Sequence, residues 1–256
     1  MNAKLIHHWS LPSNPGTKCV RAFTRIELAA VVVGMALLSV IALPLLGTTR
    51  ADSERAACYN NLRQIGRAVR QWSGDHFEEP PWLTSMSDGG TRPDGGMKIG
   101  AAWAEYLSLS NELFTPRILA CPSDAGVKVA SEWGVGPNGL VNPGFRRQAI
   151  SYLLGLHANS LYPLALVAAD FNIRLSGPAT GCELAAVNNA YALYSTPPLP
   201  PPPAESVRWT NGPHLSGGHL LVVDGSVMFV NSAGLTRTLS TLNSEDNGIH
   251  HVLRAH

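Results

Sequence analysis

The sequence predicts an α+β fold in which a long N-terminal helix packs on an antiparallel β-sheet with large loop insertions. Three patterns carry this prediction: an apolar run at residues 28–47, an apolar stripe at helical spacing in residues 58–72, and a hairpin signal in residues 219–230. Gly (24) and Pro (19) are plentiful, and charged residues make up only 14% of the chain. This composition is typical of a body rich in turns rather than of a helical bundle.

The first half of the predicted helix has the length and polarity of a transmembrane segment. Residues 28–47 contain no charged side chain, and as a helix they would be about 30 Å long, which is enough to cross the core of a bilayer. Basic residues precede this run and acidic residues follow it. That asymmetry predicts a cytoplasmic N-terminus at residues 1–22 and an exported remainder.

Three interpretations of this segment compete. A secretory signal peptide has a shorter apolar region, of about 7–15 residues, and a small-x-small cleavage site. A plain membrane anchor accounts for the length but leaves Glu27, the acid at the start of the run, without a role. Because acids in membrane segments by default mark a function, a third interpretation is needed that gives Glu27 one.

The third interpretation is a family resemblance. The stretch Phe23–Leu28 (FTRIEL), preceded by Ala22, resembles the cleavage and methylation motif of type IV prepilins and type II secretion pseudopilins. The resemblance implies that a prepilin peptidase cuts between Ala22 and Phe23 and methylates the new amine. It also places Glu27 at the fifth mature residue, where the family has its glutamate, and Pro44 at the distance of the family's helix proline.

The resemblance implies an assembly role for Glu27. In a fibre of such helices, its carboxylate would pair with the N-terminal amine of a neighbouring subunit, and pairing a buried charge selects the register in which the pair forms. The chain departs from the family at Ala22, where Gly is usual, and at Arg25, where an apolar residue is usual. Arg25 favours the alternative function, an exported binding module that uses a pilin-type leader without polymerising.

The helix prediction continues past the apolar run and ends near Gly74. Apolar residues recur there at spacings of four, three, four and three, at Cys58, Leu62, Ile65, Val69 and Trp72. A single stripe of this kind predicts an amphipathic helix that packs on the sheet. The predicted organisation is therefore a leader at residues 1–22, a helix at 23–74 with its transmembrane part at 28–47, and an exported α+β domain at 75–256.

The exported domain carries a second family resemblance. Two apolar segments flank Asp224-Gly225, the residues favoured in a two-residue hairpin turn. Nine residues separate His214 from Asp224, which resembles the H-x9-DG motif, here at residues 214–225, of a pseudopilin-associated C-terminal domain. For His214 and Asp224 we favour a structural role, a hydrogen bond that stabilises the hairpin; a metal role with His219 or Asp170 and an acid–base pair are the alternatives.

The cysteines permit one disulfide outside the cytoplasm, but their spacing does not reveal which pair forms it. Cleavage after Ala22 removes Cys19 and leaves Cys58, Cys121 and Cys182, among which one disulfide can form. Cys58 lies on the helical stripe and is interpreted as a buried apolar residue. Cys121 opens the turn Cys121-Pro122-Ser123-Asp124, which resembles a CPSD-like turn of the same family; it has no base at a recognisable spacing, so no catalytic residue is predicted.

These patterns predict a structural subunit rather than an enzyme. The expected function is a pilin-like or pseudopilin subunit, processed by prepilin peptidase and assembled with other pilin-like subunits into a type II secretion or type IV pilus-like fibre. The expected location is the inner membrane, crossed once, with the C-terminal domain in the periplasm or at the cell surface.

The expected ligands and partners are few. A net charge of +1 gives no reason to expect nucleic acid as a partner. No cofactor and no metal ligand are predicted. Calcium is the one ion left open, because related pseudopilins bind it through loop carboxylates, although a matching acid cluster is not evident. An extracytoplasmic hydrolase is the most distant alternative, and it needs a nucleophile–His–acid cluster in the fold.

Overall fold

The computed structural model describes residues 24–94, 101–174, 177–178, 190–194, 207–210, 214, 217–242 and 249–254. Two compact units divide the chain, Met1–Gly47 and Thr48–His256. The described helices are α1 (Arg25–Asp75), η1 (Met86–Asp88), α2 (Ala102–Ser108), α3 (Ser110–Leu113), η2 (Pro116–Leu119), η3 (Arg146–Gln148) and α4 (Ser232–Thr241). The described strands are β1 (Tyr152–Gly155), β2 (Leu166–Asp170), β3 (Gly177–Pro178), β4 (Ala190–Tyr194), β5 (Gly217–Val222), β6 (Val227–Asn231) and β7 (Ile249–Leu253).

The first unit holds the N-terminal part of α1, and it overturns the predicted transmembrane segment. Within the described residues, no helix is long and apolar enough to cross a membrane. The predicted fold with a transmembrane first half is therefore wrong on this structure.

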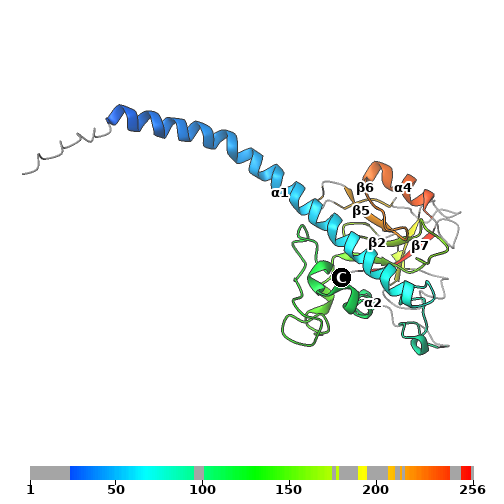
Figure 1. The fold of residues 1–256 in the computed structure, drawn as a ribbon. Helices are drawn as coiled ribbons and strands as arrows, with labels where there is room; N and C mark the ends of the chain where they lie inside the picture. The colour runs from blue at the N-terminus through cyan, green and yellow to red at the C-terminus, as the bar shows by residue number, and fades with distance from the viewer. Residues whose placement is uncertain are drawn as a thin grey trace, which may run out of the picture. The chain divides into compact units, whose positions relative to one another are not determined.

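The second unit is built on one antiparallel sheet. Its strand order is β3-β4-β7-β1-β2-β5-β6, and each neighbouring pair is antiparallel. Side chains alternate between the two faces of such strands. Leu154 of β1 belongs to a core shared with α1, and its neighbour Leu153 belongs to a second core shared with α4. The sheet is thus covered on both faces, as Figure 1 shows for α1 and α4.

The C-terminal part of α1 packs on the sheet through the predicted stripe. All five stripe residues are buried in one core, which also contains Tyr152, Ala168 and Leu221 from three strands. The helix approaches closely at Gly66, where a Cβ atom would lie 2.8 Å from Leu221 Cδ1. A small residue at this position therefore lets α1 reach β5.

The β5–β6 hairpin has a longer loop than the predicted two-residue turn. Leu221 pairs with Val227, and the Val222 N–H donates to the Ser226 carbonyl at 3.1 Å. The loop therefore contains three residues and ends at Gly225, whose φ is +84°. Three-residue hairpin loops commonly place a left-handed residue at their last position, which explains the glycine without a two-residue turn.

Candidate functional site

A disulfide joins α1 to the loop region before the sheet. Cys58 and Cys121 are bonded, with their Cα atoms 5.3 Å apart and a separation of 63 positions in sequence. Both are fully buried. The interpretation of Cys58 as a plain apolar residue is therefore wrong, and the structure chooses the pair that spacing left open. Cys182 lies outside the described residues.

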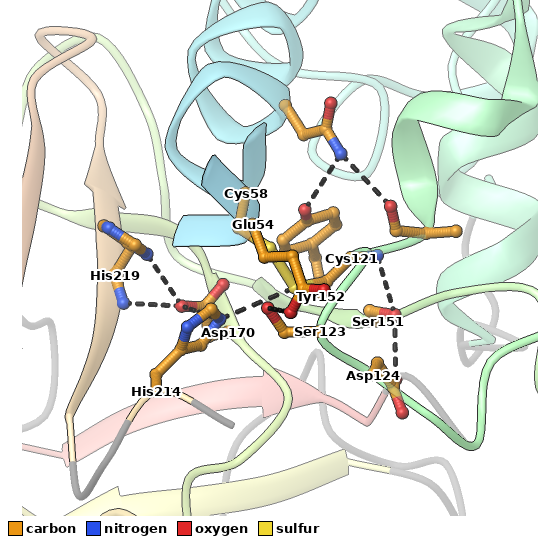
Figure 2. Close-up of a disulfide and its surroundings, with 12 residues drawn as sticks. Glu54, Cys58, Cys121, Ser123, Asp124, Ser151, Tyr152, Asp170, His214 and His219 are labelled. Atoms are coloured by element: carbon orange, nitrogen blue, oxygen red, sulfur yellow. Dashed lines mark hydrogen bonds and ion pairs between the residues drawn. A yellow bond between two sulfur atoms is a disulfide. The ribbon is translucent and has the colours of Figure 1, made fainter. Parts of the chain in front are cut away.

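The turn that begins at Cys121 is held by buried polar contacts. The Cys121 N–H donates to Ser151 Oγ at 3.0 Å, and the Ser151 hydroxyl donates to Asp124 Oδ2 at 2.8 Å. The other oxygen of Asp124 accepts from the Gly126 N–H at 3.0 Å. Figure 2 shows this chain of contacts from the disulfide to Asp124. The turn residues therefore position Cys121, which agrees with a structural role for the CPSD-like turn.

Helix α1 holds the same region from the other side. Asn61 Nδ2 donates to the Ala120 carbonyl at 3.1 Å and to the Tyr152 hydroxyl at 3.2 Å. Burial, with the charge of Asp170 as a second cause, raises the pKa of Tyr152 well above its ordinary value. The hydroxyl of Tyr152 therefore stays protonated, and the contact with Asn61 is a neutral hydrogen bond.

A cluster of one carboxylate and two histidines lies beside the disulfide. Asp170 ends β2, His219 lies on β5, and His214 precedes β5. The register Ala169↔Leu220 continues by one step to set Asp170 across from His219. Asp170 Oδ2 accepts from the His219 backbone N–H at 2.8 Å and lies 2.9 Å from His219 Nδ1. All three side chains are buried, and they point toward one another in Figure 2.

His214 connects the cluster to the disulfide through one ring nitrogen. Its Nε2 atom lies 3.5 Å from Cys121 Sγ and 3.7 Å from Asp170 Oδ2. Burial lowers the pKa of His214, while the negative charge of Asp170 opposes that shift. Among the described residues, Asp170 Oδ1 and His214 Nδ1 are buried polar atoms without a hydrogen-bond partner. Such atoms are rare in folded proteins and call for an explanation.

His219 also contacts aromatic rings. The His219 ring makes edge contacts with Tyr59, Phe229 and His214, at centroid distances of 6.1, 5.2 and 5.7 Å. Because the three polar side chains of the cluster are themselves buried, the local dielectric is low and the charge interactions among them are strengthened.

The cluster does not have the geometry of a catalytic triad. Cys121, His214 and Asp170 do meet, which is the nucleophile–His–acid combination that a hydrolase requires. However, Cys121 and Asp170 both face the same nitrogen of His214, whereas a triad uses one ring nitrogen for the nucleophile and the other for the acid. Cys121 is also bound in the disulfide and carries no thiolate. The arrangement therefore gives no support to nucleophilic catalysis.

Two donor sets in this region could hold a metal ion. One consists of Cys58, Cys121 and His214, and the other of Asp170, His214 and His219; in each, the ligand atoms lie within 4.8 Å of one another. The first set requires reduced cysteines, because a disulfide sulfur is not a thiolate ligand. The second set is complete with the disulfide formed.

The H-x9-DG residues are divided between two places. His214 belongs to the buried cluster, whereas Asp224 is exposed and its Oδ1 atom accepts from the Ser226 N–H at 2.7 Å. The contacts described for His214 are with Cys121, Asp170 and His219. The predicted contact between His214 and Asp224 does not occur among the described hydrogen bonds, because each side chain has other partners.

The N-terminal motif is described from Thr24 onward. Thr24 and Glu27 form a capping box: Glu27 Oε2 accepts from the Thr24 N–H at 2.8 Å, and the Glu27 N–H donates to Thr24 Oγ1 at 3.2 Å. This exchange satisfies helix-terminal donors and marks the start of α1. Arg25 is exposed beside it. The cleavage residues Ala22 and Phe23 lie outside the described residues, and of Pro44 only its place in α1 is described.

Sequence reasoning did not predict the buried cluster or the disulfide pair. It named Asp170 and His219 only as alternative partners of His214 in a metal role. Asp170 carried a signal, because it is an acid at the end of an apolar strand. His219 lies two residues after the start of another strand. The pairing of Cys58 with Cys121 had no sequence signal.

No protein-family model, curated protein or solved structure matches the chain. The prepilin resemblance therefore stays a prediction that rests on the residues quoted for it.

Proposed function

We propose that the chain is an exported pilin-like subunit that is cleaved before Phe23 and assembles with other pilin-like subunits through the N-terminal part of α1. The single observation that carries the proposal is the exposure of apolar side chains along that part of the helix. Large apolar residues from Ile26 to Val40 are at least half exposed on several sides of it. An apolar surface of this extent is typical of a segment that binds a partner.

The capping box supports the same proposal. A processed chain would begin at Phe23, so a cationic amine would lie one residue before the Thr24 cap. The carboxylate of Glu27 contacts Thr24 through Oε2, which leaves Oε1 for a cation of a neighbouring subunit. If an amine of one subunit and the carboxylate of its neighbour are buried together, the two helices pack in the register that pairs them, because an unpaired buried charge is costly.

The disulfide supports export. Cys58 and Cys121 are bonded and buried, and structural disulfides of this kind form and persist outside the cytoplasm. A prepilin leader would direct the second unit to such a compartment. The proposed partners are the prepilin peptidase, which would act on Ala22-Phe23, and the subunits of a type II secretion or type IV pilus-like fibre.

Mass spectrometry of the mature protein tests processing. The expected N-terminal peptide begins with methylated Phe23 and is absent from cells without prepilin peptidase. A mature protein that still begins at Met1 would contradict the proposal.

Paired substitutions then test assembly. Glu27→Gln keeps an acceptor for the Thr24 N–H but removes the charge, whereas Thr24→Ala removes the cap and keeps the charge. Single cysteines placed between Leu28 and Val40 report assembly by cross-linking of subunits in cells. We expect cross-links to be lost in Glu27→Gln and retained in Thr24→Ala. Correct processing without cross-links in the unsubstituted chain would instead support the non-polymerising binding module that Arg25 favours.

A further inference from the structure

We propose that Asp170, His214 and His219 form a buried binding site for one Zn²⁺ ion while the Cys58–Cys121 disulfide stays intact. This site goes beyond the proposed function and does not depend on it, because it lies in the second unit. Its ligands would be Asp170 Oδ2, His214 Nε2 and His219 Nδ1.

The distances between the ligand atoms fit a tetrahedral ion. Zinc binds imidazole nitrogen at about 2.0–2.1 Å and carboxylate oxygen at about 2.0–2.2 Å, so neighbouring ligand atoms lie about 3.3 Å apart. Asp170 Oδ2 lies 2.9 Å from His219 Nδ1 and 3.7 Å from His214 Nε2. These two values lie on either side of the tetrahedral separation. Small side-chain movements would therefore bring all three atoms to one ion.

Hydrogen bonding alone does not account for the arrangement. A proton on His219 Nδ1 accounts for one contact with Asp170 Oδ2. The 3.7 Å separation to His214 Nε2 is too long for a hydrogen bond. Asp170 Oδ1 has no hydrogen-bond partner among the described residues. One cation would occupy the space between Oδ2 and both imidazoles, and it would also attract Oδ1.

Burial and charge favour a cation at this point. Asp170 is fully buried, and a buried carboxylate needs a compensating positive charge. The His219 backbone N–H also donates to Asp170 Oδ2. In metal sites, hydrogen bonds of this kind orient the ligating carboxylate toward the ion.

The donor types favour zinc over calcium. Calcium is bound by six to eight oxygen atoms, whereas this cluster offers two imidazole nitrogens and one carboxylate. Two histidines and one carboxylate suit zinc, with a further position open to another ligand. Calcium, left open by the sequence, does not fit this cluster.

Metal titration of the purified full chain tests the site. The chain is first treated with a chelator, and thiol titration confirms that the disulfide remains formed. We expect one equivalent of Zn²⁺ to bind by calorimetry and one equivalent of Co²⁺ to give visible bands of a four-coordinate ion without a thiolate charge-transfer band. A thiolate band, or no stoichiometric binding, would overturn the proposal.

Variants locate the ion. His214→Gln and His219→Gln each remove one of three ligands, and we expect each to weaken Zn²⁺ binding by at least about 100-fold. His250→Gln is the matched control, since His250 is an equally buried histidine whose Nε2 lies 2.9 Å from the Leu239 carbonyl; its affinity should equal that of the unsubstituted chain. Equal affinity in all three variants would place the ion elsewhere and contradict the site.

X-ray absorption of the zinc-loaded, unsubstituted chain gives a result that needs no variant to fold. We expect a first coordination shell of nitrogen and oxygen only, with imidazole scattering from two histidines. A sulfur shell at about 2.3 Å would assign the ion to reduced cysteines and overturn the proposal.

Discussion

Arg70 of α1 occupies the space that a side chain at position 225 would need. Its Nη1 atom donates to the carbonyl of Asp224 at 2.6 Å, and a Cβ atom built on Gly225 would lie 2.3 Å from the same Nη1. Gly225 also has a φ of +84°. The DG pair of the H-x9-DG motif is therefore a point where the hairpin contacts helix α1. Glycine is required there for the left-handed backbone of the loop and for the close approach of Arg70.

The substitution Gly225→Ala should destabilise the protein by roughly 1–2 kcal/mol, because a left-handed backbone is unfavourable for alanine and the new methyl group displaces Arg70. Urea unfolding measures the change. In an Arg70→Ala background, the same substitution should cost less, since only the backbone effect remains. Gly74→Ala is the control: apart from its chain neighbours and the backbone of its own helix, no described atom lies within 4 Å of its added Cβ, and we expect no loss of stability. A Gly225→Ala variant as stable as the parent would contradict this account of the motif.

Opening the Cys58–Cys121 disulfide should lower the free energy of unfolding by roughly 4 kcal/mol, because the bond closes a loop of 63 residues and restricts the unfolded chain. The test compares urea midpoints of the Cys58→Ser/Cys121→Ser variant and the parent. Reductant should lower the parent's midpoint and leave that of the double variant unchanged. A Cys182→Ser variant that loses as much stability would show that a different pair carries the effect.

Removing the Ser151 hydroxyl should cost about 1–3 kcal/mol, because the substitution Ser151→Ala leaves the Cys121 N–H and Asp124 Oδ2 without a buried partner. Chemical denaturation measures the loss. Ser123→Ala is the matched control, since the Ser123 hydroxyl makes a longer, partly exposed contact with Glu54 at 3.3 Å. Equal losses in the two variants would refute the special role of Ser151.

Acid should destabilise the fold partly through His250. Burial lowers the pKa of this imidazole below its ordinary value of 6.5; the hydrogen bond to the Leu239 carbonyl opposes the shift, and nearby His157 and His251 add to it. Well above pH 6.5 the imidazole is neutral in both states and contributes no pH dependence. As the pH falls through 6.5 toward the lowered pKa, the unfolded chain binds protons first, so the free energy of unfolding falls.

The variant His250→Gln isolates this contribution. Its amide can still donate to the Leu239 carbonyl but does not titrate. We expect the decline in stability below pH 6.5 to be shallower than in the parent, as measured by urea unfolding across that range. An unchanged slope would mean that His250 is not a source of the acid sensitivity.

Local patterns predicted the elements whose partners are near in sequence or whose periodicity is strong. The stripe from Cys58 to Trp72 is buried as its spacing predicted, and the hairpin around Asp224-Gly225 is present with a longer loop. The transmembrane prediction is wrong on the described part of the chain, where no helix combines the length and the apolar character that crossing a membrane requires. Cleavage before Phe23 and assembly through Glu27 stay predictions.

The sequence by itself determined the helix stripe, the glycine in the hairpin and the candidate leader, because each depends on backbone preferences or periodicity within one segment. Only the tertiary structure decided which cysteines pair and which polar side chains meet. Asp170 and His219 face each other because β2 and β5 pair with Ala169 opposite Leu220, and His214 joins them beside the disulfide. No local pattern encodes those distances, since they depend on which distant strands pair and on the register of that pairing.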